Sequence, residues 1–241
     1  MKGPSVVIIG SGPGGFYAAE SISKRLNSDI DIIDRLPTPF GLIRGGVAPD
    51  HQTTKKISAA YTKTAKKDQI CFFGNIEIGK DISLEVLREI YDVVIIATGS
   101  ELDNKLEIKG ADLKGVYGSA EFVSWYNGHP DFMDLNPDLD TQNVVVIGNG
   151  NVAIDIVRVL SKTFQEMSES DIPDYALNSI NKSAVKSLYL VGRRGPVEAK
   201  FTNVELREMG NLKNCLPIVN DFDLPNKLEG DFSERDSRLI E

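Results

Sequence analysis

The sequence predicts an α/β fold in which helices cover parallel sheets. Short apolar runs such as Val6–Ile9 are typical of parallel strands that are buried on both faces. Strand-like and helix-like stretches alternate along the chain, which is the pattern of a parallel sheet with helices on its faces. The whole pattern, a strand followed by a glycine-rich turn and a helix, begins a second time at residue 144. We therefore expect two domains of the same kind.

The expected elements of the first domain are short. We expect residues 34–51, which are rich in Pro and Gly, to form a long loop, and Ser83 to cap a helix. The expected strands are 6–9, 30–33, 70–73, 76–78 and 93–97, and the expected helices are 16–24, 54–66 and 84–91.

The second domain follows a less regular polar stretch that reaches residue 142. The spacing Thr202-x-x-Glu205 predicts a capping box at the start of a helix that ends near Met209. The other expected elements are strands at 144–147 and 188–191 and helices at 119–125 and 152–164. We place the domain boundary so that residues 1–100 form the first domain and residues 101–241 the second, which is incomplete.

Composition excludes several classes of protein. The 241 residues carry a formal net charge of −8, whereas a nucleic-acid-binding protein normally has a basic excess. No apolar run approaches the ~20 residues that span a bilayer. The first strand begins near Ser5, which leaves no room for a signal peptide. We expect a cytoplasmic protein, or a mitochondrial matrix protein from which a targeting segment has been removed.

Cysteine and histidine are too scarce for a metal site or a disulfide framework. Cys71 and Cys215 are far apart in the sequence and form no C-x-x-C pair, which also excludes a redox dithiol. Cys71 lies in an apolar run, so we expect it to be buried in a strand. With only His51 and His129, a multi-histidine metal site is excluded.

The first glycine turn has the G-x-G-x-x-G form between a strand and a helix. Gly10 permits the tight turn, Gly12 lets the backbone approach a pyrophosphate, and Gly15 allows the helix to pack on the strand. The helix that follows presents N–H groups to the phosphates. Asp34 ends the second strand, where an acid accepts hydrogen bonds from a ribose hydroxyl. The alternative is an ordinary Gly-rich loop.

The second glycine turn, Gly148-Asn149-Gly150-Asn151-Val152-Ala153, has the G-x-G-x-x-A form. Its second strand ends in Arg193-Arg194 instead of an acid. Guanidinium groups grip a 2′-phosphate with paired N–H donors. This turn is therefore predicted to bind NADP, and the first turn a nucleotide without that phosphate. The alternative is that the two arginines are a solvated surface pair.

Several longer segments resemble the adrenodoxin reductase family of ferredoxin–NADP(+) reductases, and the resemblance covers nearly the whole chain. The segments are Pro39-Phe40-Gly41-Leu42-Ile43-Arg44, Gly46-Val47-Ala48-Pro49-Asp50-His51, Gly74-Asn75-Ile76-Glu77-Ile78-Gly79, the second glycine turn with Ile154-Asp155, Gly192-Arg193-Arg194-Gly195-Pro196, and residues 201–209.

The resemblance implies two Rossmann-like domains of the glutathione-reductase-like type, an N-terminal one that binds FAD and a second one that binds NADP. It implies FAD contacts for Gly14, Asp34, Leu42 and Ile78. It implies NADP contacts for Asn149, Gly150, Asn151, Val152, Arg193, Arg194 and Glu205.

The resemblance also implies the reaction. The family passes a hydride from NADPH to the flavin, and electrons then leave singly for an iron–sulfur protein of ferredoxin or adrenodoxin type. His51 and Glu205 are expected near the two rings in a catalytic role, although a loop histidine and a capping-box glutamate are the plainer interpretations. The family docks its acidic partner near Arg207. Local positive charge is added by Arg193, Arg194, Lys200 and Lys213, and the alternative for each of these residues is a solvated helix face.

The sequence departs from the family in its length. The family's chain returns to the FAD domain through a Gly-Trp segment that holds the flavin, and the single Trp125 lies elsewhere. We therefore expect a fold that is truncated at the C-terminus, and a second chain that completes the FAD domain. Two other functions stay open: a non-catalytic dinucleotide-binding fragment, and the NADPH-oxidising subunit of another flavoenzyme such as glutamate synthase, against which the lack of cysteine-rich segments counts.

Overall fold

The chain forms two compact units. The computed structural model describes residues 3–100, 102–193, 195 and 198–219. The first unit comprises Met1–Val47 and His51–Leu102, and the second comprises Ala48–Asp50 and Asp103–Glu241. Within the described part of the chain, no helix has the length and apolar character needed to cross a membrane.

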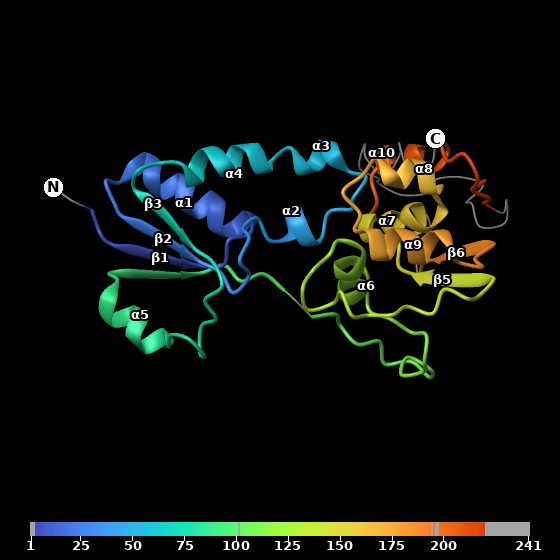
Figure 1. The fold of residues 1–241 in the computed structure, drawn as a ribbon, viewed down its shortest axis with the longest axis horizontal. Helices are drawn as coiled ribbons and strands as arrows, with labels where there is room; N and C mark the ends of the chain where they lie inside the picture. The colour runs from blue at the N-terminus through green and yellow to red at the C-terminus, as the bar shows by residue number, and fades with distance from the viewer. Residues whose placement is uncertain (1–2, 101, 194, 196–197, 220–241) are drawn as a thin grey trace. The chain divides into compact units, whose positions relative to one another are not determined.

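The first unit is built on a parallel sheet with the strand order β3-β2-β1-β4 (Figure 1). The register pairs Val6 of β1 with Ile30 of β2 and with Val93 of β4. The elements are β1 Val6–Ile9, α1 Pro13–Arg25, β2 Ile30–Ile33, α2 Leu42–Gly45, α3 Gln52–Lys55, α4 Ser58–Ala65, β3 Ile70–Phe73, α5 Leu84–Ile90 and β4 Val93–Ile96.

Helices cover both faces of this sheet. On one face, Phe16 and Ala19 of α1 and Tyr61 of α4 pack against Ile8 and its neighbours in β2 and β3. On the other face, Leu87 of α5 packs with Val7, Ile9 and Ile33. Every residue of β1 is buried, as the unbroken apolar run predicts for a central parallel strand.

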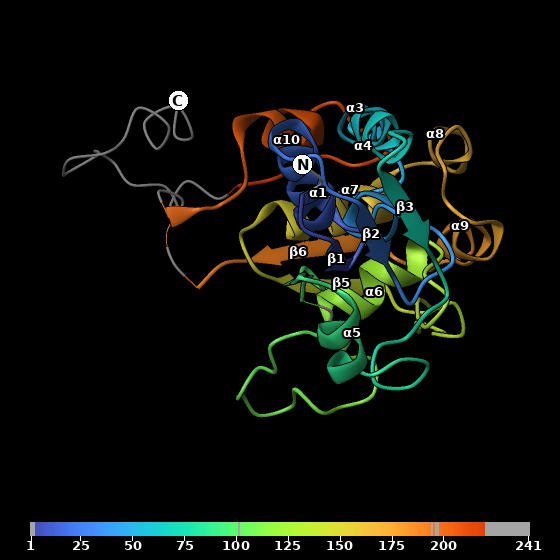
Figure 2. The ribbon, with the colours of Figure 1, turned by 90° about the vertical axis from the view of Figure 1, so that its left-hand side faces the viewer.

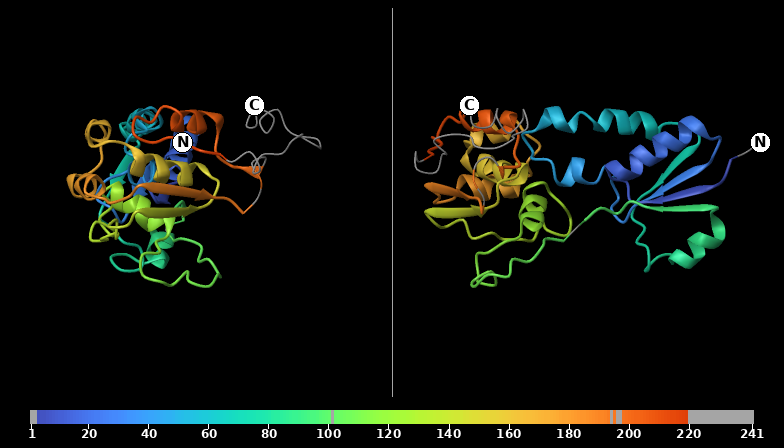
Figure 3. Two further views of the ribbon diagram at one scale, coloured as in Figure 1. Left: turned by 90° about the vertical axis from the view of Figure 1, so that its right-hand side faces the viewer. Right: turned by 180° about the vertical axis from the view of Figure 1, so that it is seen from behind.

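The second unit contains a shorter parallel sheet, in which β5 (Asn143–Ile147) pairs with β6 (Ser187–Val191) from Asn143↔Ser187 onward. Helix α7 (Asn151–Ser161) packs against both strands (Figure 3). The other helices are α6 Ser119–Tyr126, α8 Phe164–Ser168, α9 Asp174–Asn181 and α10 Asn203–Met209. This second start of the strand–turn–helix pattern confirms the α/β prediction.

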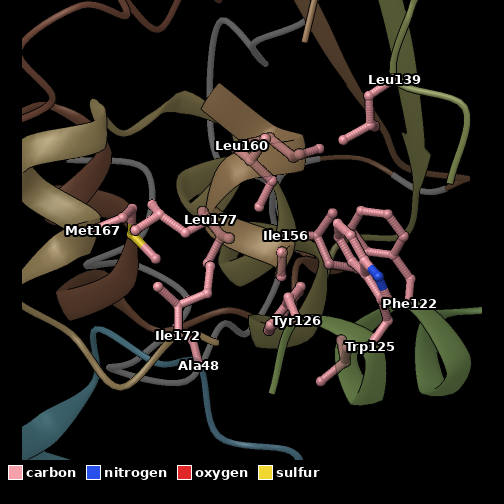
Figure 4. Close-up of a cluster of buried hydrophobic side chains, with 14 residues drawn as sticks. Ala48, Phe122, Trp125, Tyr126, Leu139, Ile156, Leu160, Met167, Ile172 and Leu177 are labelled. Carbon is pink, nitrogen blue, oxygen red and sulfur yellow. The ribbon is translucent and has the colours of Figure 1, made fainter. Parts of the chain in front are cut away.

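An apolar core joins the helices of the second unit (Figure 4). Phe122, Trp125 and Tyr126 of α6 form its aromatic centre, with the Phe122 and Trp125 rings 5.4 Å apart. Ile156 of α7 and Leu177 of α9 pack against this centre. Because Trp125 is the only tryptophan and is buried here, its fluorescence reports on this unit.

One face of the β5–β6 sheet is packed and the other is exposed. Val144, Val146, Leu188 and Leu190 point toward the helices. Their neighbours in the two strands point away and are about half exposed, although both faces of a parallel sheet are normally covered. These exposed residues, which we call the outer face, are Val145, Ile147, Tyr189 and Val191. Figure 2 shows the two strands side by side.

Several predicted elements differ from those observed in the first unit. Residues 54–66 form two helices, because Lys56 and Ile57 interrupt the run between α3 and α4. The predicted strand 76–78 is wrong, since only an isolated bridge joins Ile78 to Ile82. Cys71 is exposed and not buried, because its side chain points away from the packed residues of its edge strand. The predicted loop 34–51 contains the short helix α2.

In the second unit, the predicted helix 152–164 ends at Ser161. Thr163 begins the separate helix α8, and its hydroxyl accepts from the Glu166 N–H while Glu166 accepts from the Thr163 N–H. Helix α9 was not expected. The capping box predicted at Thr202 is wrong: in the described structure the Thr202 side chain makes no capping hydrogen bond.

A buried group of charges binds the segment Ala48–Asp50 to the rest of the second unit. The Asp50 carboxylate accepts from Arg158 Nε at 2.8 Å, from Arg158 Nη2 at 2.9 Å and from Lys162 Nζ at 2.6 Å. Arg158 Nη1 also donates to Asp155 at 2.7 Å. We call these four residues the Arg158 cluster. Ala48, two residues before Asp50, is fully buried in the apolar core.

The charges around Asp50 make the stability of this unit sensitive to acid. Although burial raises the pKa of its carboxyl, the hydrogen bonds and charges of Arg158 and Lys162 outweigh that effect and hold the pKa well below its usual range. A carboxyl whose pKa is lowered by folding stabilises the folded state above its unfolded pKa of about 4, and this contribution is lost as the pH falls further.

We expect the free energy of unfolding, measured with urea and Trp125 fluorescence, to decrease when the pH is lowered below about 4. Asp50→Asn should lower it at pH 7 by about 3–5 kcal/mol and leave less further loss on acidification. An unchanged acid response in this variant would contradict the assignment to Asp50.

The N-terminus of α6 depends on one carboxylate from a distant loop. Asp103 accepts from the Ala120 N–H at 2.8 Å and from the Ser119 hydroxyl at 3.0 Å. Asp103→Ala should lower the free energy of unfolding by about 1–2 kcal/mol, because it removes these partners from the helix end. Tyr126→Phe is the contrasting variant, since the buried Tyr126 hydroxyl has no hydrogen-bond partner among the described residues. We expect it to change stability by less than about 0.5 kcal/mol. Equal losses of stability in the two variants would contradict the role assigned to the Asp103 hydrogen bonds.

Candidate dinucleotide-binding sites

The first glycine turn brings backbone against backbone. Gly10 has φ +108°, and a Cβ atom there would overlap the carbonyl oxygen of Ala97, which follows β4. A Cβ atom on Gly15 would overlap the Gly10 carbonyl oxygen, whereas Gly14 has ordinary space beside Ala97. Gly12 is the N-cap of α1, and no described side chain forms a capping hydrogen bond there. The first turn of α1 therefore presents its N–H groups without a side-chain acceptor.

Asp34 lies at the end of β2 and is joined directly to this turn. Its Oδ2 atom accepts from the Ser11 N–H at 2.8 Å and from the Ser11 hydroxyl at 2.5 Å. Its Oδ1 atom accepts from the Leu36 N–H at 2.9 Å. A carboxylate has about four acceptor positions, so these three bonds leave capacity for another donor. Sequence reasoning found Asp34 but missed Ser11, which is fully buried and orients the carboxylate.

The residues after Pro39 pack directly against the first glycine turn. The Phe40 N–H donates to the Ser11 carbonyl at 3.0 Å, and Gly41 lies so close that a Cβ atom would be 2.8 Å from the Gly12 Cα atom. Phe40 has φ +94°, an unusual conformation for a residue with a side chain. Its ring is held by Phe16, 5.3 Å away, and by Tyr61, 6.0 Å away. This packing stabilises a strained backbone at the edge of the turn.

The other residues expected near the flavin have different surroundings. Leu42 begins α2 and is 63% exposed. Ile78 is partly buried and packs with the apolar cluster around Ile33 and Leu87. His51 is half-buried and is the N-cap residue of α3. The structure thus brings Asp34 to the first turn, while Ile78 has a packing role that accounts for its burial.

The second turn repeats the geometry of the first. Gly148 has φ +143°, and its N–H donates to the Val191 carbonyl at the end of β6. Gly150 is the N-cap of α7 in an extended conformation, and no described side chain forms a capping hydrogen bond to it. Val152, in the first turn of α7, is 48% exposed. This helix end also offers N–H groups to an anion.

Residues 200–202 are hydrogen-bonded to the second glycine turn. The Asn149 carbonyl accepts from the Lys200 N–H at 2.6 Å and from the Phe201 N–H at 3.2 Å. The Asn151 side-chain oxygen accepts from the Thr202 N–H at 3.1 Å. The sequence identified both asparagines as candidate ligands. Their bonds to residues 200–202 could not be predicted, because these residues lie some 50 positions away and no local sequence pattern indicates the contact. These bonds hold the start of α10 beside the turn.

Arg193 lies at the predicted ribose end. Its neighbour Gly192 is in contact with the Asn149 side chain, because a Cβ atom on Gly192 would overlap the Asn149 amide. The Arg193 side chain is exposed, so its guanidinium is accessible to a phosphate. Arg194 lies outside the described residues.

Glu205 has an unusual environment in α10. Its Oε2 atom is shielded from solvent, and no described residue supplies a hydrogen bond to it. A buried carboxylate oxygen without a donor is unfavourable, and such atoms call for a missing partner. Since the expected capping box is not formed, the plainer interpretation of Glu205 loses its support. Arg207, two residues further along, is exposed.

Comparison with known proteins agrees with this arrangement. Residues 4–169 match the family described as pyridine nucleotide-disulphide oxidoreductase. The chain belongs to this family. It is 47% identical over 221 residues to the mitochondrial NADPH:adrenodoxin oxidoreductase of Arabidopsis thaliana and 42% identical over 222 residues to that of Homo sapiens. It is also 43% identical to the NADPH-ferredoxin reductase FprA of Mycobacterium leprae. These relatives confirm the resemblance to the adrenodoxin reductases.

The likeness extends to structure. FprA of Mycobacterium tuberculosis, solved in complex with NADPH, superimposes with a TM-score of 0.85 at 43% identity, over 88% of this chain and 48% of that one. The alignments cover 91% of this chain but 46% of the Arabidopsis protein, and 92% but 45% of the human protein. The chain therefore spans about half the length of the curated relatives it matches.

The contact between Gly41 and Gly12 makes a testable demand on the first turn. Gly41→Ala should lower the free energy of unfolding by more than the ~1–3 kcal/mol that a strained backbone alone costs, because the new Cβ atom would also overlap Gly12. Gly79→Ala is the matched control, since Gly79 also has a positive φ, of +91°, but has no neighbour within 4 Å. Chemical unfolding followed by far-ultraviolet circular dichroism measures both losses. Similar losses in the two variants would show that the close approach of Gly41 to Gly12 adds nothing.

Proposed function

We propose that this chain provides the FAD- and NADP-binding core of an NADPH–ferredoxin reductase. The observation that carries the proposal is the pair of glycine turns with different chemistry at their ribose ends. The first turn is bonded to the carboxylate of Asp34, and the second leads to the exposed guanidinium of Arg193. A carboxylate accepts from ribose hydroxyls and repels a 2′-phosphate, whereas a guanidinium binds that phosphate.

The residues of the first turn fit FAD. The N-terminus of α1 would hold the pyrophosphate through Gly12, Gly14 and Gly15, with the backbone approach that Gly10 permits. The remaining acceptor capacity of Asp34 would take a ribose hydroxyl. Leu42, which is exposed, and Ile78 would contribute apolar contacts. When bound, the flavin supplies the capacity to take a hydride and to release electrons one at a time.

The residues of the second turn fit NADP. Gly148, Gly150 and the N-terminus of α7 would hold the pyrophosphate, with Asn149, Asn151 and Val152 around it. Arg193, together with Arg194, would bind the 2′-phosphate. The unpartnered Oε2 atom of Glu205 would accept a hydrogen bond from a ligand donor such as a carboxamide. Orientation of the two rings then contributes most of the rate, and His51 and Glu205 tune the local charge.

The proposed electron acceptor is an iron–sulfur protein of ferredoxin or adrenodoxin type. Such partners are acidic and need a basic surface, which the net charge of −8 does not provide globally. Arg207, Lys200 and Lys213 are exposed and supply a local positive surface around α10. We propose that this surface docks the partner, in the cytoplasm or in the mitochondrial matrix.

A second polypeptide segment is also part of the proposal. The outer face of the β5–β6 sheet exposes Val145, Ile147, Tyr189 and Val191 together. Parallel sheets are covered on both faces, so this apolar surface favours a covering segment. A second chain that completes the fold would supply it. If so, this chain alone would be a dinucleotide-binding fragment of limited activity.

Visible absorption of the purified chain tests the function. We expect flavin bands, present as purified or after addition of FAD, that bleach when NADPH is added under argon. NADH should bleach them more slowly. A protein that stays colourless with added FAD would refute independent flavin binding and support the need for a second chain.

Arg193→Ala tests the assignment of the second turn to NADP. Loss of a charge-assisted hydrogen bond is worth about 1.5–3 kcal/mol, so the Kd for NADPH should rise roughly 10-fold to 150-fold. The Kd for NADH, which lacks the 2′-phosphate, should stay within about twofold. Arg207→Ala serves as the control, because it should leave both Kd values unchanged. An equal loss of NADPH and NADH affinity in Arg193→Ala would contradict the 2′-phosphate assignment.

A further inference from the structure

Two helices of the second unit begin with the same Thr-x-x-Glu spacing but have different caps. In α8, the Glu166 carboxylate accepts from the Thr163 N–H at 2.9 Å, and the Thr163 hydroxyl accepts from the Glu166 N–H at 3.2 Å. This reciprocal pair is a capping box. In α10, the Thr202 side chain makes no capping hydrogen bond, and the Glu205 Oε2 atom is shielded from solvent without a partner among the described residues. The same local spacing therefore gives two different helix starts.

An acceptor from outside α10 distinguishes the two starts. The Thr202 N–H, which the glutamate of a capping box would bind, donates instead to Asn151 Oδ1 at 3.1 Å. Asn151 is the first residue of α7 and part of the second glycine turn, 51 positions before Thr202. Because a backbone N–H is a single donor, Asn151 occupies the place that Glu205 would have in the box. The carboxylate of Glu205 is thereby released from the helix end.

The released carboxylate is unfavourable unless something binds it. A buried carboxylate oxygen that has lost its water without gaining a donor raises the free energy of the folded state. Contacts at both ends of α10 hold this arrangement: before the helix, the Lys200 N–H donates to the Asn149 carbonyl at 2.6 Å, and at its end Met209 packs with Ile154 of α7. Helix α10 is thus fixed on α7, and Glu205 Oε2 is left for a donor from a ligand.

We propose that Asn151 is a positioning residue for Glu205: by accepting the Thr202 N–H, it keeps the Glu205 carboxylate out of a capping box and available to a ligand donor beside the second glycine turn. This inference rests on the proposed function and deepens it, since the donor would be a neutral N–H or O–H group of NADP(H). The Asn151 side chain then acts on the nucleotide only through Glu205. Its backbone remains part of the helix end proposed to hold the pyrophosphate.

The Kd for NADP+ of the full chain, measured by titration calorimetry in a double-mutant cycle, tests this indirect role. Asn151→Ala should let Glu205 return to the Thr202 N–H, so the Kd should rise roughly 10-fold to 150-fold, as for the loss of a hydrogen bond to a charged group. In a Glu205→Ala background, Asn151→Ala should change the Kd by less than about twofold. An equal loss in both backgrounds would show that the Asn151 side chain binds the nucleotide directly, and would overturn the proposal.

Amide hydrogen exchange at Thr202, followed by nuclear magnetic resonance of the chain without nucleotide, gives a second readout. Glu205→Ala alone should leave the exchange rate unchanged, because Asn151 is the acceptor. Asn151→Ala alone should change it by less than about twofold, since Glu205 takes over the N–H. Only the double variant should leave this amide without an acceptor and speed its exchange, roughly 2-fold to 12-fold. The full acceleration in Asn151→Ala alone would show that Glu205 does not return, and would overturn the proposal.

Two further variants serve as controls. Asn151→Asp keeps an acceptor oxygen, so in the Glu205→Ala background Thr202 exchange should stay as slow as in the unchanged chain. Fast exchange there would overturn the assignment of this bond to the side-chain oxygen. Asn178→Ala removes an exposed amide from α9 of the same unit, and it should change neither the Kd nor the exchange rate.

The two readouts separate this inference from the proposed function. If the unchanged chain binds no NADP+ but the exchange rates follow the expected pattern, the NADP assignment is rejected and the release of Glu205 by Asn151 is retained. If the chain binds NADP+ but the exchange rates do not follow the pattern, the positioning role is rejected and the NADP assignment is retained.

Discussion

The close approach of backbone to backbone at the end of β1 is the constraint on which the first unit depends. A central parallel strand buried on both faces must pass into a helix within three residues, and Gly10, Gly15 and Ala97 meet where a side chain would overlap the main chain. Only residues without a Cβ atom permit this passage. The same geometry leaves the N-terminus of α1 facing outward with Gly12 at its cap, so one requirement of packing also creates a site for an anion.

The glycine turn of the second unit is held in place by different residues. Its turn relies on Asn149 and Asn151, whose oxygens accept from the backbone of residues 200–202, where the first turn relies on Ser11 and Asp34. The first turn thereby carries a negative group at its edge, and the second stands beside a positive one. Electrostatic sign, more than fold, distinguishes the two units as ligand sites.

Prediction from the sequence succeeded where the signal was local. The buried strands at 6–9 and 30–33 were correct, because β-branched residues fill the first run and all but Asp31 of the second. The helix at 54–66 was predicted as one and forms two, since helix-forming residues continue through Lys56 and Ile57 without a breaker. The exposure of Cys71 depends on which face of an edge strand is covered, and the local pattern does not determine that. In the candidate sites, the glycines and Asp34 were found from spacing, whereas the bonds of Ser11 and of residues 200–202 join positions that only the fold brings together.

The segment Ala48–Asp50 gives the chain an unusual division. The boundary between the units is crossed at residues 47–48, 50–51 and 102–103, so a cut at the last point alone does not separate them. A fragment that began at Asp103 would lack Ala48 from its core and would leave Arg158 without its principal counter-ion. The two nucleotide-binding units therefore do not behave as interchangeable modules. Exchange of the second unit between related proteins, in evolution or in the laboratory, has to include Ala48–Asp50, which lie in the sequence between the two parts of the first unit.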